Sequence, residues 1–153
     1  MRDDLYNIVA SVCDYPVIWA YENGKRPKTT FFLLDVRTVN AQWSGIVGNV
    51  ADDGSRQIDA NREANVYLTC FGKGADVLLD EVAMRLQTER VLDMLEAANA
   101  DIVDFDTIQH APKLFERDYE PQAVLGFRYR YTANTTETVD FIESVDLGID
   151  TQP

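Results

Sequence analysis

The sequence predicts an α+β protein in which a mainly antiparallel or mixed β-sheet packs two central helices on one face. Three observations lead to this prediction. Segments with strand-like patterns are grouped on either side of a pair of helix-like patterns, an order typical of α+β folds. The length of 153 residues suits a single domain, 1–153. A composition of 46% hydrophobic and 26% charged residues is that of a globular protein.

An N-terminal helix is predicted by the spacing of four apolar residues, Leu5, Ile8, Val9 and Val12. Asp3 and Asp4 lie at its positive end, and the helix should end before Pro16. The next segment, VIWAYE, is interpreted as a short strand followed by an Asn-Gly turn at 23–24. The run TTFFLLDVRTV at 29–39 predicts a central strand, because residues 31–34 are apolar on both faces.

Residues 41–61 differ from the segments around them. They contain three glycines and an Asp52-Asp53-Gly54 turn signal, and they lack a clear apolar period. We therefore expect a protruding loop or hairpin whose tip lies at Asp53-Gly54. The following NVYLTCFG, residues 65–72, alternates between apolar and polar residues and predicts a second strong strand.

Two helices follow Gly72 and Gly74. The first is predicted over 75–86 by a helical stripe of apolar residues, and the second begins after Thr88, a good N-cap residue. The segment IVDFDTIQH, 102–110, is predicted to be a short strand. A strand is predicted to end near Thr132, another over TVDFIESVDL at 138–147, and residues 147–153 are expected to be frayed.

The strand in YEPQAVLGFRYRYT, residues 119–132, has two different faces. One face is apolar and suits a covering of helices: Ala123, Leu125, Phe127, Tyr129 and Tyr131. The other carries Gln122, Val124, Gly126, Arg128 and Arg130. The two arginines could stack on nucleic-acid bases. We instead expect them to pair with carboxylates of the sheet or of a neighbouring subunit, the candidates being Asp35, Glu116, Asp118 and Glu120.

The charge of the chain argues against a general nucleic-acid binder. Its 26 acidic residues outnumber 14 basic ones, giving a net charge of −12, whereas tight binding to DNA requires lysines and arginines against the phosphates. We expect no membrane crossing, because no apolar run approaches the roughly 20 residues of a span. Asp3 and Asp4 stand where a signal peptide would be positive, so we expect the chain to be assembled in a cytoplasm.

The sequence predicts no catalytic, cofactor or metal site. Gly72-Lys73-Gly74 lacks the remaining residues of a phosphate-binding loop. Asp101, Asp104, Asp106 and the single histidine, His110, spread too far along a strand to hold one ion. Cys13 and Cys70 show no metal or redox spacing. Composition still allows an enzyme that uses an unrecognised pair of carboxylates.

Three segments in sequence order resemble the neck or tail terminator family of tailed bacteriophages. They are PVIWAYENGKRPKTTFFLLDV, VYLTCFGKGADVLLDEVAMRL and LFERDYEPQAVLGFRYRYT, within residues 5–135. The resemblance implies a structural virion protein that forms a ring, commonly a homohexamer, at the neck between head and tail. Such a ring stops growth of the tail tube. It joins the tail tube or sheath protein to the head connector, lets DNA pass, and needs no cofactor.

The physical pattern agrees with such a role. An acidic bore repels DNA and lets it slide, and head-to-tail interfaces close into rings. We expect the 41–61 segment and the strand faces to contact neighbouring subunits. The candidate residues are Trp43, Ile46, Val47, Arg56, Asp35, Arg37, Glu116, Arg117, Arg128 and Arg130. The alternative is a small acidic binding module that mimics DNA to inhibit a host protein.

Overall fold

The computed structural model describes residues 1–41, 45–115 and 117–140, with the backbone alone at 113 and 115. It confirms the α+β fold. The main sheet has seven strands in the order β1-β2-β4-β9-β5, with β3 also paired to β4 and β6 also paired to β9. Only β1 and β2 are parallel in this sheet, so it is mixed and mainly antiparallel.

The strands of the main sheet are β1 (Val17–Trp19), β2 (Phe31–Asn40), β3 (Gly45–Val47), β4 (Ser55–Phe71), β5 (Ala100–Val103), β6 (Gln109–His110) and β9 (Gln122–Thr138). Strands β7 (Lys113–Phe115) and β8 (Asp118–Glu120) form a separate hairpin. The helices are α1 (Arg2–Val12), α2 (Ala75–Arg85) and α3 (Glu89–Ala97).

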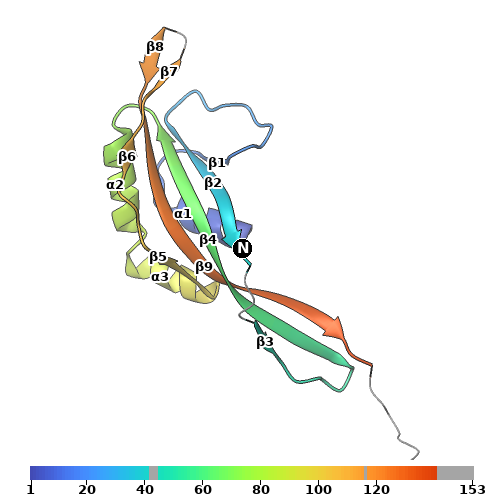
Figure 1. The fold of residues 1–153 in the computed structure, drawn as a ribbon. Coiled ribbons are helices and arrows are strands. Elements are labelled where there is room, and N and C mark those ends of the chain that lie inside the picture. The colour runs from blue at the N-terminus through green and yellow to red at the C-terminus, as the bar shows by residue number, and fades with distance from the viewer. Residues whose placement is uncertain (42–44, 116, 141–153) are drawn as a thin grey trace, which may run out of the picture.

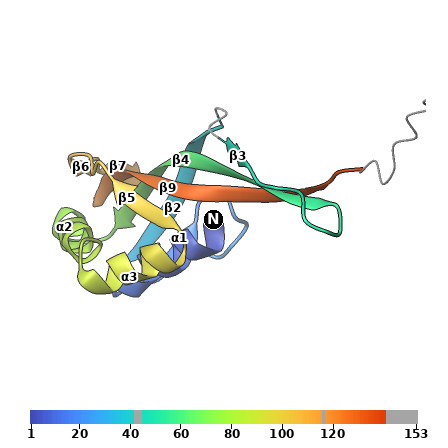
Figure 2. The same ribbon diagram turned by 90° about the horizontal axis from the view of Figure 1, so that it is seen from below.

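All three helices cover the same face of the sheet (Figure 2). The predicted stripe of α1 is buried there, together with Leu79 and Val82 of α2 and Val91 and Leu95 of α3. The predicted apolar face of β9 meets them: Ala123, Leu125, Phe127 and Tyr129 are at most 2% exposed. The side of the sheet away from the helices is called the outer face below.

Strands β4 and β9 are the longest elements, and they pair along their whole length of 17 residues. Their distal halves extend beyond the helices as a twisted ribbon, to which β3 adds a short third strand (Figure 1). We call β3, residues 55–61 and residues 132–138, with the connecting loop, the arm. The described part of the predicted 41–61 hairpin, residues 45–61, has its turn at 52–54, and the C-terminal half of β9 completes it.

Several predicted boundaries were wrong. The strand predicted at 65–72 begins at Ser55, and the strand expected to end near Thr132 continues to Thr138. The strand predicted at 102–110 is interrupted at Asp104, whose φ of 51° breaks the extended backbone. The predicted start of α3 is confirmed, since Thr88 is its N-cap residue, although the Thr88 hydroxyl donates to the Arg85 carbonyl oxygen and makes no capping hydrogen bond. Residues 141–147 of the last predicted strand, and the expected fraying at 147–153, lie outside the described residues.

Candidate assembly surfaces

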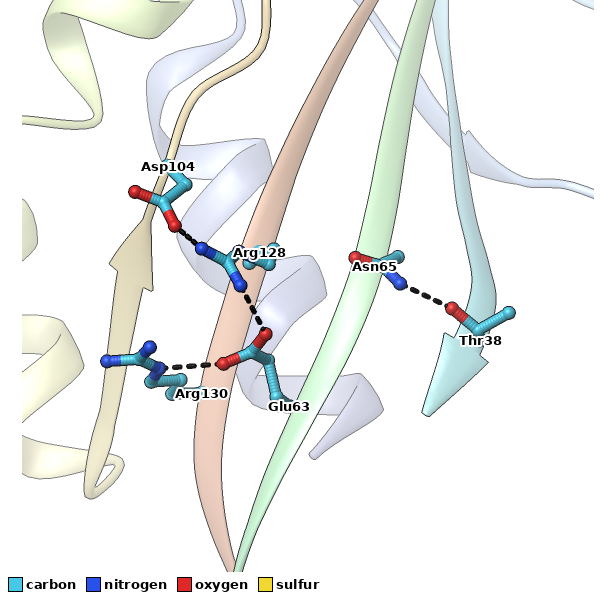
Figure 3. Close-up of polar contacts among 6 residues, drawn as sticks. All are labelled: Thr38, Glu63, Asn65, Asp104, Arg128 and Arg130. Atoms are coloured by element: carbon cyan, nitrogen blue, oxygen red, sulfur yellow. Dashed lines mark hydrogen bonds and ion pairs between the residues drawn. The ribbon is translucent and has the colours of Figure 1, made fainter. Parts of the chain in front are cut away.

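Arg128 and Arg130 stand on the outer face, where they share one carboxylate. Arg128 Nη1 donates to Glu63 Oε1 at 2.9 Å, and Arg130 Nε donates to Glu63 Oε2 at 2.8 Å (Figure 3). Arg128 also pairs with Asp104. The four side chains therefore form a continuous line of alternating charge across β4, β9 and the end of β5.

This network corrects the predicted partners. Asp35 pairs with Arg37 at 3.1 Å, and Glu120 pairs with Arg26. Glu116, another predicted partner, lies outside the described residues. The sequence missed Glu63 because its proximity follows from the register of β4 against β9, which places it opposite Arg130. The break at Asp104 likewise brings in a carboxylate that a continuous strand would not have placed there.

The shared contact changes the acidity of Glu63. The hydrogen bond from Arg130 is the main cause that lowers the pKa of this carboxyl below its ordinary value of 4.5, and Arg128 adds to the effect. Glu63 is consequently ionised throughout the neutral range. Because both arginines already have a carboxylate within the chain, a partner that used them would have to share or replace Glu63.

A second charged group extends the outer face over β2. Arg37 lies beside Asp35 and holds its guanidinium 4.1 Å from the ring centre of Tyr67. The register shift between Val36 and Thr38 marks a bulge at this arginine. Half of the Arg37 side chain remains exposed, so this cation is held in place and is still open to a partner.

Gly126 lies on the same face without a side chain because a neighbour occupies that space. A Cβ here would overlap the Asp106 carboxylate and come within 3.3 Å of Tyr67 Cε1. The Asp106 backbone N–H also donates to the Gly126 carbonyl oxygen at 2.8 Å. The interruption of the alternating pattern at Gly126 is therefore a packing site for residue 106. Gln122, on the same face of β9, is buried.

The arm carries the most exposed apolar residues of the interface candidates. Ile46 is 73% exposed and Val47 is 46% exposed, both on the edge strand β3. Arg56 pairs across the arm with Glu137 of β9. Trp43 lies outside the described residues, and Arg117 is exposed in the turn between β7 and β8.

An open groove of about 720 Å³ lies where the arm leaves the helix-covered body. Its polar lining comes from the crossing of β4 and β9, from the end of α3 and from the start of β5. It includes Arg62, Glu63, Glu96, Asp101 and Arg130. The sequence did not reveal this groove because its walls come from segments far apart along the chain. Within the described ranges, no three His, Cys, Asp or Glu residues group as a metal site.

The two thiols are free. Burial raises the pKa of Cys13 to about 12 and that of Cys70 to about 11, so both are protonated at neutral pH. Among the described helices, none has the length and apolar character of a membrane span.

A comparison with curated proteins finds no match. The model of a family described as phage neck terminator protein matches residues 1–152, nearly the entire chain. This match confirms the resemblance drawn from the three sequence segments, and it favours a structural role in the phage neck over a DNA mimic or an enzyme. The chain belongs to the phage neck terminator protein family.

Proposed function

We propose that this protein forms a closed ring, with six copies as the expected number, at the junction of head and tail. The ring ends the tail tube, joins it to the head connector on one side and to the tail tube or sheath protein on the other, and leaves a channel for DNA. Family membership supports the neck location. The remaining argument comes from the shape and the charges of the chain.

The arm is the observation that carries the proposal. It extends away from the hydrophobic core, and its edge strand β3 presents Ile46 and Val47 to solvent. Pairing within the arm satisfies its central strand, while one edge of β3 and the edge of β9 beyond Tyr131 have no neighbour among the described strands. Exposed apolar side chains beside open strand edges suit contact with a second polypeptide.

The charge supports a channel that DNA crosses without being bound. A net charge of −12 on each copy would surround a central bore with a negative field that repels phosphate. On the outer face, Arg128 and Arg130 already share Glu63, which reduces their availability to nucleic acid. The proposed function therefore uses contacts between proteins for assembly and repulsion for passage of the genome.

The experiment that tests this proposal changes the arm without unfolding it. Deletion of residues 45–58 is unsuitable, because 55–58 belong to β4 and pair with β9. Replacing Ile46 and Val47 together by serine removes the exposed apolar surface and keeps the backbone. Tyr15→Ser is the matched control, since Tyr15 is an exposed apolar residue outside the arm.

Negative-stain microscopy and light scattering would then measure the assembly state. We expect rings from the wild-type protein and from Tyr15→Ser, and smaller particles from the double arm variant with an unchanged circular dichroism spectrum. If the double variant formed rings as the wild type does, the arm would not be part of the ring contact. Wild-type protein that stays monomeric or dimeric at all concentrations would contradict the ring itself.

A further inference from the structure

The positive charges of this acidic chain are unevenly distributed in space. Its four lysines are Lys25, Lys28, Lys73 and Lys113. They come from three segments that meet at one end of the sheet, because Phe31, Phe71 and Gln122 are aligned there in the strand register. Figure 1 shows this end, with the β1–β2 loop and the β7–β8 hairpin, opposite the arm. The structure describes only the backbone of Lys113, whereas Arg117 is exposed in the turn of the β7–β8 hairpin. We therefore call Lys25, Lys28, Lys73 and Arg117 the basic end.

The cations of the basic end lack partners among the described residues, as does Arg90 on α3, whereas Arg26 at the same end pairs with Glu120. Lys25, Lys28, Lys73 and Arg117 are exposed, and none makes an ion pair or hydrogen bond with any residue that the structure describes. Elsewhere, six arginines pair with carboxylates: Arg2, Arg37, Arg56, Arg85, Arg128 and Arg130. In a chain with 26 acidic residues, four exposed cations without a partner in the described part of the structure are available to carboxylates or phosphates of a partner.

The β7–β8 hairpin adds apolar surface to the basic end. Leu114 is 64% exposed and Tyr119 is 72% exposed. Of the two carboxylates in the same hairpin, Asp118 is exposed and Glu120 pairs with Arg26. Cations mixed with an exposed leucine and tyrosine, and with acids among them, are typical of a protein interface. The exposed leucine and tyrosine beside the cations favour an acidic protein surface over nucleic acid as the partner.

The chain itself carries a surface of complementary charge. The solvent-exposed sides of α2 and α3 carry three apolar residues, Val77, Met84 and Leu92. The same two helices expose Asp80, Glu89, Asp93 and Glu96, for which no ion pair is found among the described residues, against one unpaired cation, Arg90. We call the three apolar and four acidic residues the acidic helix face. It combines apolar and charged groups as the basic end does, with the opposite sign.

We propose that the basic end of one copy binds the acidic helix face of the next copy. This inference rests on the proposed ring, and it names the contact between neighbours that the family assignment leaves unspecified. The two surfaces are different, so the contact is head-to-tail and can propagate around a closed ring. The arm, at the opposite end of the molecule, makes a second contact, and the proposed ring requires both.

Charge exchange tests this contact. One variant carries Lys25→Glu, Lys28→Glu and Lys73→Glu, and a second carries Asp80→Lys, Asp93→Lys and Glu96→Lys. Each variant alone places like charges across the contact, whereas a chain with all six substitutions restores opposite charges. The second variant has a net charge of −12 + 6 = −6, so general repulsion alone predicts that it associates more readily than the wild type.

We expect the opposite result, weaker association, for the variant that carries Asp80→Lys, Asp93→Lys and Glu96→Lys. Sedimentation velocity at about 50 mM salt should show that each triple variant needs at least about tenfold more protein than the wild type to associate. The six-substitution chain, and an equimolar mixture of the two triple variants, should recover association. Circular dichroism melting of each variant would establish that all of them fold.

Three other results would overturn the inference, each in a distinguishable way. Rings of unchanged stability in both triple variants would reject this contact and leave the proposed function standing. A wild-type protein that never associates would reject both. Duplex DNA that binds the wild type, and loses binding in the lysine variant while rings persist, would identify phosphate as the partner of the basic end.

Discussion

Glu63 on β4 lies directly opposite Arg130 on β9, and Arg130 Nε donates to its Oε2 at 2.8 Å. The second oxygen accepts from Arg128, so one carboxylate joins two like charges that stand on the same strand. Without it, the two guanidinium groups would repel each other across a partly exposed surface. Glu63 is thus the centre of the charged network on the outer face.

Glu63→Gln should lower the thermal stability of the protein. Glutamine keeps the size of the side chain but removes the charge that balances Arg128 and Arg130. The loss should be larger at low salt than at high salt, because screening weakens the repulsion between the arginines. Asp59→Asn is the control, since Asp59 lies on the same face of β4 and its side chain accepts a hydrogen bond from Gln57 with no ion pair among the described residues. Equal melting temperatures for Glu63→Gln and the wild type would show that the network is stabilised without this carboxylate.

The lowered pKa of Glu63 also predicts how stability depends on pH. A carboxyl whose pKa is lower in the folded protein than in the unfolded chain stabilises the fold above its ordinary value of 4.5. This contribution is lost as the pH falls through the lowered value. Urea unfolding between about pH 5 and about pH 3 should therefore show a smaller loss of stability for Glu63→Gln than for the wild type. An equal loss in both proteins would exclude Glu63 as a source of the acid sensitivity.

The sequence predicted the parts of the fold that depend on one-sided burial. The stripe in α1 and the alternation in β9 are each fixed by contact with the core, so local spacing reveals them. The distal half of β4 is different, because the arm has solvent on both sides and needs no apolar alternation. Its strand character comes from pairing with residues 132–138, more than 70 positions away. Local patterns contain no information about that pairing.

The candidate surfaces were predictable only in their composition. The arginines at 128 and 130 were recognised as a charged face, but Glu63 was missed because strand register is a property of the whole sheet. The basic end was missed for the same reason. Lys25 and Lys28 belong to one loop and Lys73 to another, and only the alignment of Phe31 with Phe71 brings the two loops to one edge. Spatial clusters of this kind require the topology before they can be identified.

Gly126→Ala should destabilise the protein by about 1–3 kcal/mol, since the added methyl group would overlap the Asp106 carboxylate beside the Tyr67 ring. Gly24→Ala is a matched control: a Cβ at Gly24 meets nothing within 4 Å. Urea denaturation of both variants measures the difference. A Gly126→Ala variant as stable as Gly24→Ala would mean that residue 106 moves aside without cost.

The thiols should resist alkylation in the folded protein. The pKa of about 12 for Cys13 and about 11 for Cys70 leaves very little thiolate at pH 8, and thiolate is the reactive form. Iodoacetamide at pH 8 should label both residues only after urea unfolds the chain, as mass spectrometry would detect. Rapid labelling of native Cys13 would contradict the burial that raises its pKa.

Truncation of a side chain should lower the free energy of unfolding less in the arm than in the helix-covered body. Leu125 is 1% exposed beneath the helices, so Leu125→Ala should lower the free energy of unfolding by about 2–5 kcal/mol. Ile58 lies in the arm, is only half-buried and pairs with Val47 and Thr135 at the ribbon surface. Ile58→Ala should therefore lower the free energy of unfolding by less than half of that amount in the same urea titration. It should increase amide hydrogen exchange across 55–61 and 132–138 while leaving the rest of β4 protected. Equal costs for the two substitutions would show that the arm unfolds together with the core, and the arm would then be a rigid extension of the sheet.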